Sequence, residues 1–449
     1  MKVFGKLILA CAAVFALLQL IRPGIPSRTA TAEIQVPPHI HQILEKDCYS
    51  CHSDQRRLAW FDEIQPGYWL VRKDVLTARW HLDFSTLGSK PAPAQKGALY
   101  EAVNMIQLGA MPLPRFLALH PDARVSSEDL AAMKAYLSPW APLPGPVAST
   151  GASVSAATPP ISLENVSPEW TGVAFDPSFE TWKPLSFTDR GDNNSFRFVL
   201  GNDIAVQAAE SGHISPWPDG TRFAKVAWHQ QLGRDGLVYP GGFWQVELMT
   251  KDSGKYASTE GWGWGRWRSL DLKPYGSNAR FVNECTGCHQ PVKGDDYVYT
   301  PPITSARSTL PEDVNNRAAS LPEGLPYHPL RWTAITMFVD QKSHTMSTLY
   351  GNAVAIRSVD ARNSSPSAPH YPSGAVLALV TWFQRDDPHW FGARIPDVPA
   401  SVEFVTMGPQ NAPSYRSFNG PNLAETHSGA AAMAQRISFL VDLKPASLP

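Results

Sequence analysis

The sequence has almost no cysteine to spare for disulfide bonds. It contains five cysteines: Cys11 lies in an apolar N-terminal segment, and the other four form two C-x-x-C pairs. No cysteine therefore remains for a structural disulfide in the mature chain. Net charge is also nearly absent, at −1 with a pI near 6.9. This balance gives no electrostatic footprint for nucleic acid, and we expect no nucleic-acid partner.

A long hydrophobic run occurs only at the N-terminus. Lys2 and Lys6 precede about fifteen mostly apolar residues, 7–21, a run that is short for a membrane span. Small residues at 30–32 offer a cleavage site before Glu33. We expect export to the periplasm, with residues 1–32 acting as a signal peptide. If they stay uncleaved, they form an anchor that tethers the protein to the inner membrane.

Proline is abundant, with 41 residues of 449, and it helps to divide the chain. The usual share of proline is roughly 5%, so this excess indicates many loops and linkers. Residues 33–140 show helical periodicity, and 141–160 are a linker rich in Pro, Ala and Ser. The remainder reads as strands: 161–305 form one β domain, 306–326 a linker, and 327–449 a second β domain. The predicted fold class is therefore multidomain α + β, with an all-α domain followed by two mainly antiparallel β-sheet domains.

The two C-x-x-C pairs are each followed directly by histidine. Cys48 and Cys51 precede His52, and the second motif follows in "NECTGCHQ". A lone C-x-x-C pair is equally compatible with zinc binding or redox chemistry. Two C-x-x-C-H motifs on a chain with an export signal predict two covalently attached haem c groups. Cys285 and Cys288 would hold the second haem, and His52 and His289 would each bind an iron.

The first haem would lie in an α-helical domain. Residues 95–109 carry an apolar stripe that ends at a glycine, and 126–137 begin with a capping box at Ser126. Between them, Met111 in "GAMPLP" is the best candidate for a sixth ligand. This order (motif helix, methionine loop, closing helix) is that of mono-haem cytochromes c, which transfer electrons. The alternative for Met111 is an ordinary core methionine.

The N-terminal stretch resembles the haem-binding domain family found near the N-termini of exported bacterial proteins. The matching segments are "CYSCHSD", "WFDEIQPGYW", "LDFS" and "GAMP…LHPDARVSSEDL". Where that family has a Gly-Arg pair, this chain has Ala78-Arg79. Arg79 remains a candidate to bind a haem propionate as a bidentate donor, and a solvated arginine is the equal alternative.

The two β domains are repeats of each other. Trp182 precedes Gly201 by nineteen residues, as Trp332 precedes Gly351, and "GNDIAVQA" then matches "GNAVAIRS". "PDGTRFAKVAWHQ" matches "PSGAVLALVTWFQ". The second copy lacks a C-x-x-C-H motif, so the comparison indicates an internal duplication in which only the first copy carries haem. We expect the copies to pair within the chain as a pseudo-dimer, which predicts a largely monomeric protein.

The duplication identifies candidate residues for the second haem site. Period-two alternation places Lys225 and His229 on one face of a strand. The haemless copy has Leu379 and Phe383 there, as expected if apolar side chains refilled the haem space. The alternative is that both are half-exposed strand residues. No methionine loop follows His289, so we expect a five-coordinate iron with an open distal side.

Residues 165–305 resemble the cytochrome P-460 family and its relative cytochrome c prime-beta. The resemblance rests on "GNDIAVQAAESGHISPWPDGTRFAKVAW", "EGWGWGRW" and "NECTGCHQPVKGDDYV". It implies a β-sheet fold, a C-terminal haem motif and homodimers. It also implies oxidation of hydroxylamine where a lysine is cross-linked to the haem, or binding of nitric oxide or carbon monoxide without that bond. Lys225 is the natural cross-link candidate, although the cross-link position can instead correspond to His229.

The sequence therefore predicts an exported dihaem c-type cytochrome. Its five-coordinate haem would bind or oxidise a small nitrogen species, hydroxylamine or nitric oxide, and exchange electrons with the His/Met haem and a redox partner protein. Two alternatives stay open: a non-enzymatic nitric oxide or carbon monoxide binding protein, and a pure dihaem electron carrier.

Overall fold

The computed structural model describes residues 2–27, 31–55, 58–138, 163–305, 307–364 and 371–448. Two compact units divide the chain, Met1–Trp140 and Ala141–Pro449. The first is helical and the second is an antiparallel β unit, which confirms the predicted fold class. The linker predicted at 141–160 lies outside the described residues.

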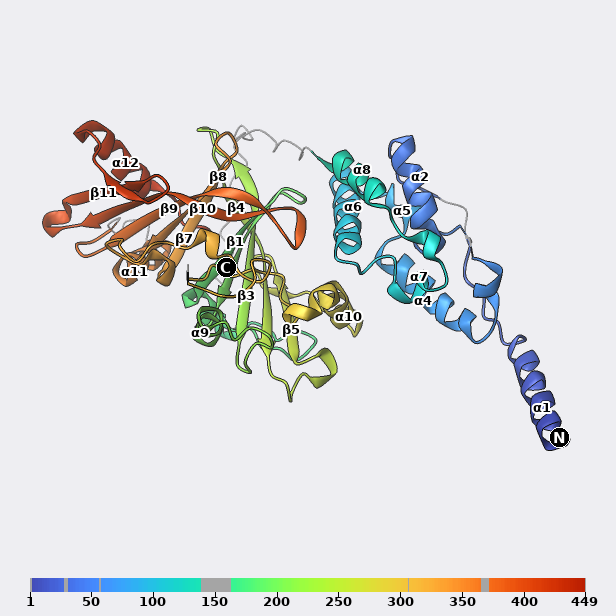
Figure 1. Cartoon of the computed structure of the whole chain (residues 1–449). Coiled ribbons are helices and arrows are strands. Elements are labelled where there is room, and N and C mark those ends of the chain that lie inside the picture. The colour runs from blue at the N-terminus through green and yellow to red at the C-terminus, as the bar shows by residue number, and fades with distance from the viewer. Residues whose placement is uncertain are drawn as a thin grey trace. The chain divides into compact units, whose positions relative to one another are not determined.

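The helical unit is shown in blue and cyan in Figure 1. Among its described residues, no helix combines the length and apolar character that a membrane crossing requires. Its helices are α1 (Lys2–Leu18), α2 (Pro38–Asp47), α3 (Tyr49–His52), α4 (Gly67–His81), α5 (Phe84–Leu87), α6 (Ala92–Gln107), α7 (Pro114–Leu117) and α8 (Ser127–Leu137).

Two helices form as the local sequence signals predicted. α6 ends near Gly109, whose φ of +71° suits a residue without a Cβ atom. α8 begins after Ser126, whose hydroxyl accepts a hydrogen bond from the N–H of Asp129. Helix α4 lies within the region predicted as helical, but the local sequence signals did not mark it as a separate helix.

The segment that follows α1 is part of the helical unit. Tyr68, on α4, donates its hydroxyl hydrogen to the carbonyl oxygen of Pro23 over 2.7 Å, and Trp69 donates to that of Ile21 over 3.1 Å. Ile25 is 7% exposed and packs with Tyr68 and Val75. Residues 19–27 thus form a strap along α4, and Cys51 of the first motif packs against the same cluster.

In the β unit, both repeats show the same order of elements. The first contains β1 (Lys183–Arg190), β2 (Ser195–Gly201), α9 (Asp203–Ser211), β3 (Arg222–Leu232), β4 (Val238–Lys251), β5 (Trp262–Arg268), β6 (Lys273–Pro274) and α10 (Arg280–His289). The second contains β7 (Thr333–Asp340), β8 (Thr345–Gly351), α11 (Ala353–Ser364), β9 (Val376–Asp387), β10 (Trp390–Met407), β11 (Pro413–Asn419), β12 (Ala424–Thr426) and α12 (Ala430–Asp442). The described strands form one antiparallel sheet.

The two repeats are joined by equivalent strand pairs. β1 pairs with β10, with Asp189 opposite Arg394, and β7 pairs with β4, with Val339 opposite Val238. Strands β1 to β4 and β7 to β10 therefore close into a ring, while β5–β6 and β11–β12 extend from β4 and β10. Because each repeat contributes the same strands to both junctions, the repeats are related by an approximate two-fold axis.

Side chains from both repeats share the core inside this ring. Phe187 lies with its ring centroid 5.9 Å from that of Trp382 and 6.0 Å from that of Tyr350. Trp228 and Trp382 are both fully buried. A core of this kind leaves each repeat with an uncovered apolar face when it is alone.

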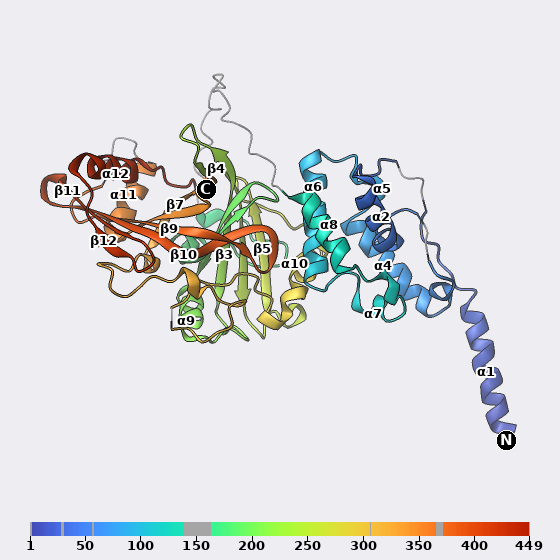
Figure 2. The ribbon, with the colours of Figure 1, turned by 45° about the horizontal axis from the view of Figure 1, so that its top comes forward.

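Two outer clusters lie on the other face of the strands, one in each repeat. The first packs β2, β3 and β5 against α9 and α10, and the second packs β8 and β9 against α11 and α12. Figures 1 and 2 show α10 beside β5 and α12 beside β11, so the helix that carries the second C-x-x-C-H motif has a counterpart without it. The haemless repeat therefore has a helix at the place that carries the haem motif in the first repeat.

Truncation after Arg307 should expose the shared core. The shortened chain leaves β1 and β4 without their partners, and we expect a dimer or an aggregate and a lower thermal midpoint. Sedimentation velocity and thermal melting measure both. Trp382→Ala is the control, because it should cost about 3–5 kcal/mol while both junctions persist. A truncated chain that stays monomeric with an unchanged midpoint would contradict the role of the second repeat.

A chain that begins at Glu33 should have a less stable helical unit. It loses the buried Ile25 side chain and the acceptors of Tyr68 and Trp69, which together should lower the free energy of unfolding by about 2–4 kcal/mol. Denaturant titration of the isolated helical unit, with and without residues 19–32, measures the difference. Equal midpoints would show that the strap adds no stability.

Candidate functional site

The first C-x-x-C-H motif lies at a break between two helices. α2 buries Ile40, Ile43 and Leu44, and α3 begins directly after Cys48, whose φ of −122° interrupts the helix. His52, the last residue of α3, donates its Nδ1 hydrogen to the carbonyl oxygen of Leu82 over 2.9 Å. This bond fixes the tautomer and leaves the lone pair on Nε2, the arrangement that an iron-binding histidine needs.

In the second motif, the histidine is also fixed by a hydrogen bond to a backbone carbonyl oxygen, although the surrounding fold is different. Cys285, Cys288 and His289 all lie on α10, and His289 donates from Nδ1 to the carbonyl oxygen of Tyr297 over 2.7 Å. Burial lowers the pKa of His289 to about 3, so its imidazole is neutral at physiological pH. Burial lowers the pKa of His52 as well. Both histidines are therefore available as neutral nitrogen ligands.

Burial favours the protonated form of three motif cysteines. It raises the pKa of Cys48 and Cys285 to about 12 and that of Cys51 to about 11. Thiols with such values are poorly suited to thiolate redox chemistry. They are compatible with covalent attachment of haem.

Arg79 lies beside the first motif. Its guanidinium is 3.3 Å from the carboxylate of Asp54 and also donates to the carbonyl oxygen of Pro26 on the strap. The Arg79 side chain is 9% exposed, and its Nε–H has no partner among the described residues. A buried guanidinium with a spare donor fits a propionate contact, which remains a prediction for Arg79.

Met111 lies half-buried in the turn between α6 and α7, where its N–H bonds to the carbonyl oxygen of Met105. Its role as the sixth ligand stays a prediction. Sequence reasoning gave no role to His120, which stacks on Phe116 at 4.0 Å and bonds to the buried carboxylate of Asp62 over 2.9 Å. His120 and Asp62 line a pocket beside Ser50 of the first motif.

Around the second motif, the sheet presents a row of charged side chains. Strand register places Lys225 between Val199 and Glu247, and Glu247 opposite Arg266, so these side chains share one face. Lys225 contacts Glu247, and Arg266 bonds to Glu247 over 2.6 Å. Arg266 also bonds over 2.8 Å to Glu284, which lies on α10 next to the motif. The row therefore reaches from β3 to the haem-motif helix.

Lys225 lies in a strongly cationic environment. Burial and the guanidinium groups of Arg197, Arg266 and Arg190 hold the pKa of Lys225 well below its usual value, although 32% of its side chain is exposed. Its charge in turn acts on Cys285 and His289 of the motif. The structure thus brings Lys225 and the motif together, and an amine that loses its proton easily is a candidate nucleophile.

In the haemless repeat, Leu379 occupies the position equivalent to that of Lys225. Leu379 lies opposite Glu403, as Lys225 lies opposite Glu247, so the two pairs are equivalent in register. Leu379 is 1% exposed and packs with Leu440 of α12 in the outer cluster. In the haemless repeat, an apolar cluster thus covers the strand face that corresponds to the Lys225 face of the first repeat.

His229 has a different setting. It lies opposite Ser195, is exposed, and stacks its ring on Trp244 at 5.1 Å. It shares a strand face with Lys225 but contacts Trp244 rather than the motif. Its proposed role as a distal or cross-link residue remains a prediction.

Two tryptophans of "GWGWGRW" pack at the motif. Trp264 has its ring centroid 4.6 Å from that of His289, and Trp262 packs in the same cluster as Cys285. Trp267 points to the opposite face and belongs to the shared core. Gly263 and Gly265 leave room for neighbouring rings, since a Cβ atom on Gly263 would meet Tyr256 at 2.4 Å.

This surface fits a haem with its two carboxylates. Arg197 has no partner for its Nε among the described residues, and burial together with Arg190 lowers its pKa to about 9. The buried indole N–H of Trp264 likewise finds no partner in the part of the chain that the structure describes. Both buried N–H groups need a partner, which propionate oxygens would supply.

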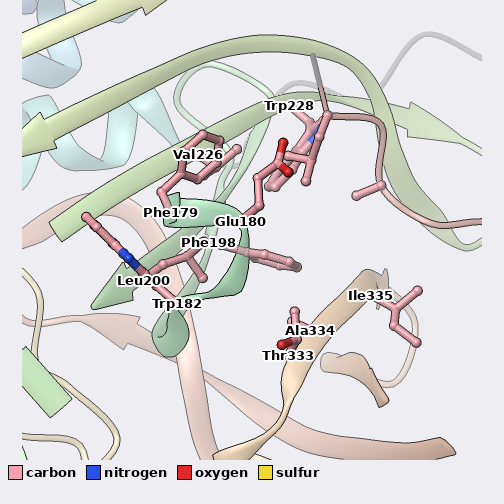
Figure 3. Close-up of a pocket in the computed structure, with 12 residues that line it drawn as sticks. Phe179, Glu180, Trp182, Phe198, Leu200, Val226, Trp228, Thr333, Ala334 and Ile335 are labelled. Carbon is pink, nitrogen blue, oxygen red and sulfur yellow. The ribbon is translucent and has the colours of Figure 1, made fainter. Parts of the chain in front are cut away.

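The pocket shown in Figure 3 lies in the shared core, and no residue of either C-x-x-C-H motif lines it. It is lined from both repeats by residues that include Phe179, Glu180, Trp228 and Ala334. Trp228 lies on the face of β3 opposite to Lys225, so this pocket and the motif surface are separated by the sheet. The pocket therefore belongs to the packing between repeats.

The sequence alone did not identify the residues that strand pairing brings next to Lys225. Glu247 and Arg266 carried no motif, and only correct alignment of β3, β4 and β5 shows that they meet Lys225. Asp296 was not given a role, although it accepts hydrogen bonds from Lys251 over 2.8 Å. The signal that was available is the alternation of charged and apolar residues on β3 and β5.

Comparison with known protein families agrees with this arrangement. Residues 13–139 match the model of a haem-binding domain, and residues 177–300 match the model of cytochrome P460. Among proteins with a curated description, none matches the chain. The two matches coincide with the helical unit and the first β repeat, each of which positions a neutral histidine behind a C-x-x-C pair. The chain is therefore a haem cytochrome that carries a haem-binding domain followed by a cytochrome P460 domain.

Proposed function

We propose that this cytochrome binds two covalently attached haem c groups and acts on a small nitrogen species, hydroxylamine or nitric oxide. Cys48 and Cys51 would hold one haem, and Cys285 and Cys288 the other. When bound, a haem supplies one-electron chemistry and an iron that takes small ligands. The two surroundings differ, which favours different roles: electron transfer in the helical unit and ligand chemistry in the β unit.

One observation carries this proposal. Lys225 lies on the face next to α10, has a lowered pKa, and is replaced by Leu379 in the copy without the motif. A neutral amine at this position can accept a proton from a bound substrate, or form a covalent bond to the haem edge. Glu247 contacts Lys225 and is itself held by Arg266, so it would position the amine.

The second candidate function is binding of nitric oxide or carbon monoxide without turnover. The contact of Lys225 with Glu247 favours it, because an ion-paired ammonium is a poor nucleophile. Peptide mass spectrometry separates the candidates. A haem-linked peptide that contains Lys225 supports the enzyme, and an unmodified peptide supports the binding protein.

A pure electron carrier is the third reading, and an optical spectrum tests it. A high-spin ferric component that changes with hydroxylamine supports ligand chemistry at the second haem. A spectrum without any high-spin component, unchanged by hydroxylamine, would contradict the proposal and leave electron transfer alone.

We also propose periplasmic export, an intrachain pseudo-dimer and a separate redox partner protein. The basic and apolar N-terminal residues support export, and the strap at 19–27 supports retention of at least this segment on the helical unit. The closed ring supports a monomer, because the surface that pairs identical subunits in relatives would be used within the chain.

Met111→Ala should convert the first haem to a high-spin state, because its iron would lose the thioether ligand. Both haems should remain covalently attached. The weak long-wavelength absorption band that marks iron–methionine ligation reports the loss. Met105→Ala is the matched control and should keep the band. A band that survives Met111→Ala would identify another residue as the ligand.

Lys225→Leu copies the haemless repeat and should change the spectrum of the second haem only. The variant removes an ionisable group from the motif surface, so nitric oxide affinity should change by about tenfold or more. His229→Phe copies the same repeat at the exposed position, and we expect a smaller change of the same haem. Unchanged spectra and affinities in both variants would show that neither Lys225 nor His229 influences the second haem.

A further inference from the structure

The haemless repeat reaches the haem motif of the first repeat through one hairpin. The tip between β9 and β10 includes His389, which is 8% exposed. His389 donates its Nδ1 hydrogen to the carbonyl oxygen of Tyr299 over 2.6 Å. Tyr299 belongs to the first repeat and follows α10 by ten residues, so this bond joins the second repeat to the segment behind the motif.

Tyr299 in turn contacts the motif in two ways. Its hydroxyl donates to the carbonyl oxygen of Cys288 over 2.6 Å, and its ring centroid lies 5.1 Å from that of His289, at 73°. Trp390, the next hairpin residue, packs edge-on against the Tyr299 ring at 5.8 Å. Tyr299 is thus held between the hairpin and the iron-binding histidine.

The hairpin itself is held firmly. The N–H groups of Gly191 and Asp192 donate to the carbonyl oxygen of Gly392 over 3.0 and 3.3 Å. The indole N–H of Trp390 bonds to Asp192, and the Arg190 guanidinium lies 4.4 Å from the Trp390 ring. These contacts follow from the pairing of β1 with β10, which closes the ring of strands.

The approximate two-fold axis provides an internal comparison. The corresponding hairpin of the first repeat, between β3 and β4, reaches toward the outer cluster of the second repeat. There Tyr239 packs on Phe338 at 5.8 Å, and Phe338 packs on Phe439 of α12 at 5.7 Å. The ring contacts there are apolar and Leu237 packs beside them, whereas the contact at the motif adds hydrogen bonds from His389 and Tyr299. The polar chain occurs on the side that carries the C-x-x-C-H motif.

We propose that the haemless repeat is a positioning element for the second haem: His389 and Trp390 hold Tyr299, and Tyr299 fixes the orientation of His289. The orientation of an iron-binding imidazole and the hydrogen bonds around it influence ligand affinity and redox potential. The second repeat therefore acts on the haem site without contributing an iron ligand. This inference deepens the proposed function and rests on haem attachment at Cys285 and Cys288.

The test uses the full-length protein with haem attached. His389→Leu removes the donor to Tyr299, and Tyr299→Phe removes only the hydroxyl that bonds to Cys288. Both should shift the midpoint potential of the second haem in spectroelectrochemical titration and leave the first unchanged. Both should also shift the iron–histidine stretching band in the resonance Raman spectrum, and change carbon monoxide affinity by about tenfold.

Two further variants separate positioning from general stability. His389→Gln keeps an N–H donor and should restore the wild-type potential. Tyr239→Phe removes the hydroxyl bond to Asp235 at the corresponding hairpin and should leave both haems unaffected. If His389→Leu and Tyr299→Phe retain the wild-type potential, the inference is overturned. A wild-type protein that binds no carbon monoxide would contradict the proposed function alone, because the potentials still test the hairpin.

Discussion

The structure of the β unit depends on the closure of its ring of strands, and a buried carboxylate lies at one junction. Asp189 is 5% exposed and accepts hydrogen bonds from Gln230 over 2.6 Å and from Gln384 over 2.9 Å. One glutamine comes from each repeat. Burial raises the pKa of Asp189, so these amide donors are needed to offset the loss of water around its carboxylate. The same junction aligns β1 with β10 and thereby places the β9–β10 hairpin at the motif.

The sequence predicted the features that depend on local chemistry. The two C-x-x-C-H motifs, the cap at Ser126 and the matching Trp-to-Gly spacings each follow from a few neighbouring residues. The equivalent caps at Asn202 and Asn352, whose side chains accept hydrogen bonds from Ala205 and Ala355, agree with the predicted duplication. Such signals survive because neighbours in sequence are neighbours in space.

The rest depended on strand register and on contacts between distant segments. Period-two alternation placed Lys225 on a face, but only the pairing of β3 with β4 brings it to Glu247. Nothing in the sequence around His389 indicates its bond to Tyr299, ninety residues earlier. The ring closure likewise requires two strands from different repeats to meet, which composition and periodicity do not specify.

The two repeats neutralise their equivalent glutamate carboxylates, Glu247 and Glu403, in different ways. In the second, Glu403 is satisfied by two bonds from Arg436 of α12 and one from the Tyr415 hydroxyl. In the first, Glu247 pairs with Lys225 and Arg266, and Arg197 remains as a further, half-buried cation. The repeat without the motif has a closed polar network over an apolar cluster. The repeat with the motif keeps a positive surface that suits an anionic group.

Two of the buried core tryptophans, Trp228 and Trp382, also link the completion of each repeat to distant parts of the chain. The indole N–H of Trp382 bonds to the carbonyl oxygen of Ala319, and that of Trp228 bonds to the carbonyl oxygen of Ser447, 219 residues further along the chain. The first repeat therefore cannot complete its core until the C-terminal residues have arrived. Contacts of such long sequence separation form slowly, because a large loop must close first. Cys285 and Cys288 therefore precede in the chain, by about the length of the second repeat, the C-terminal residues that complete their own half of the core.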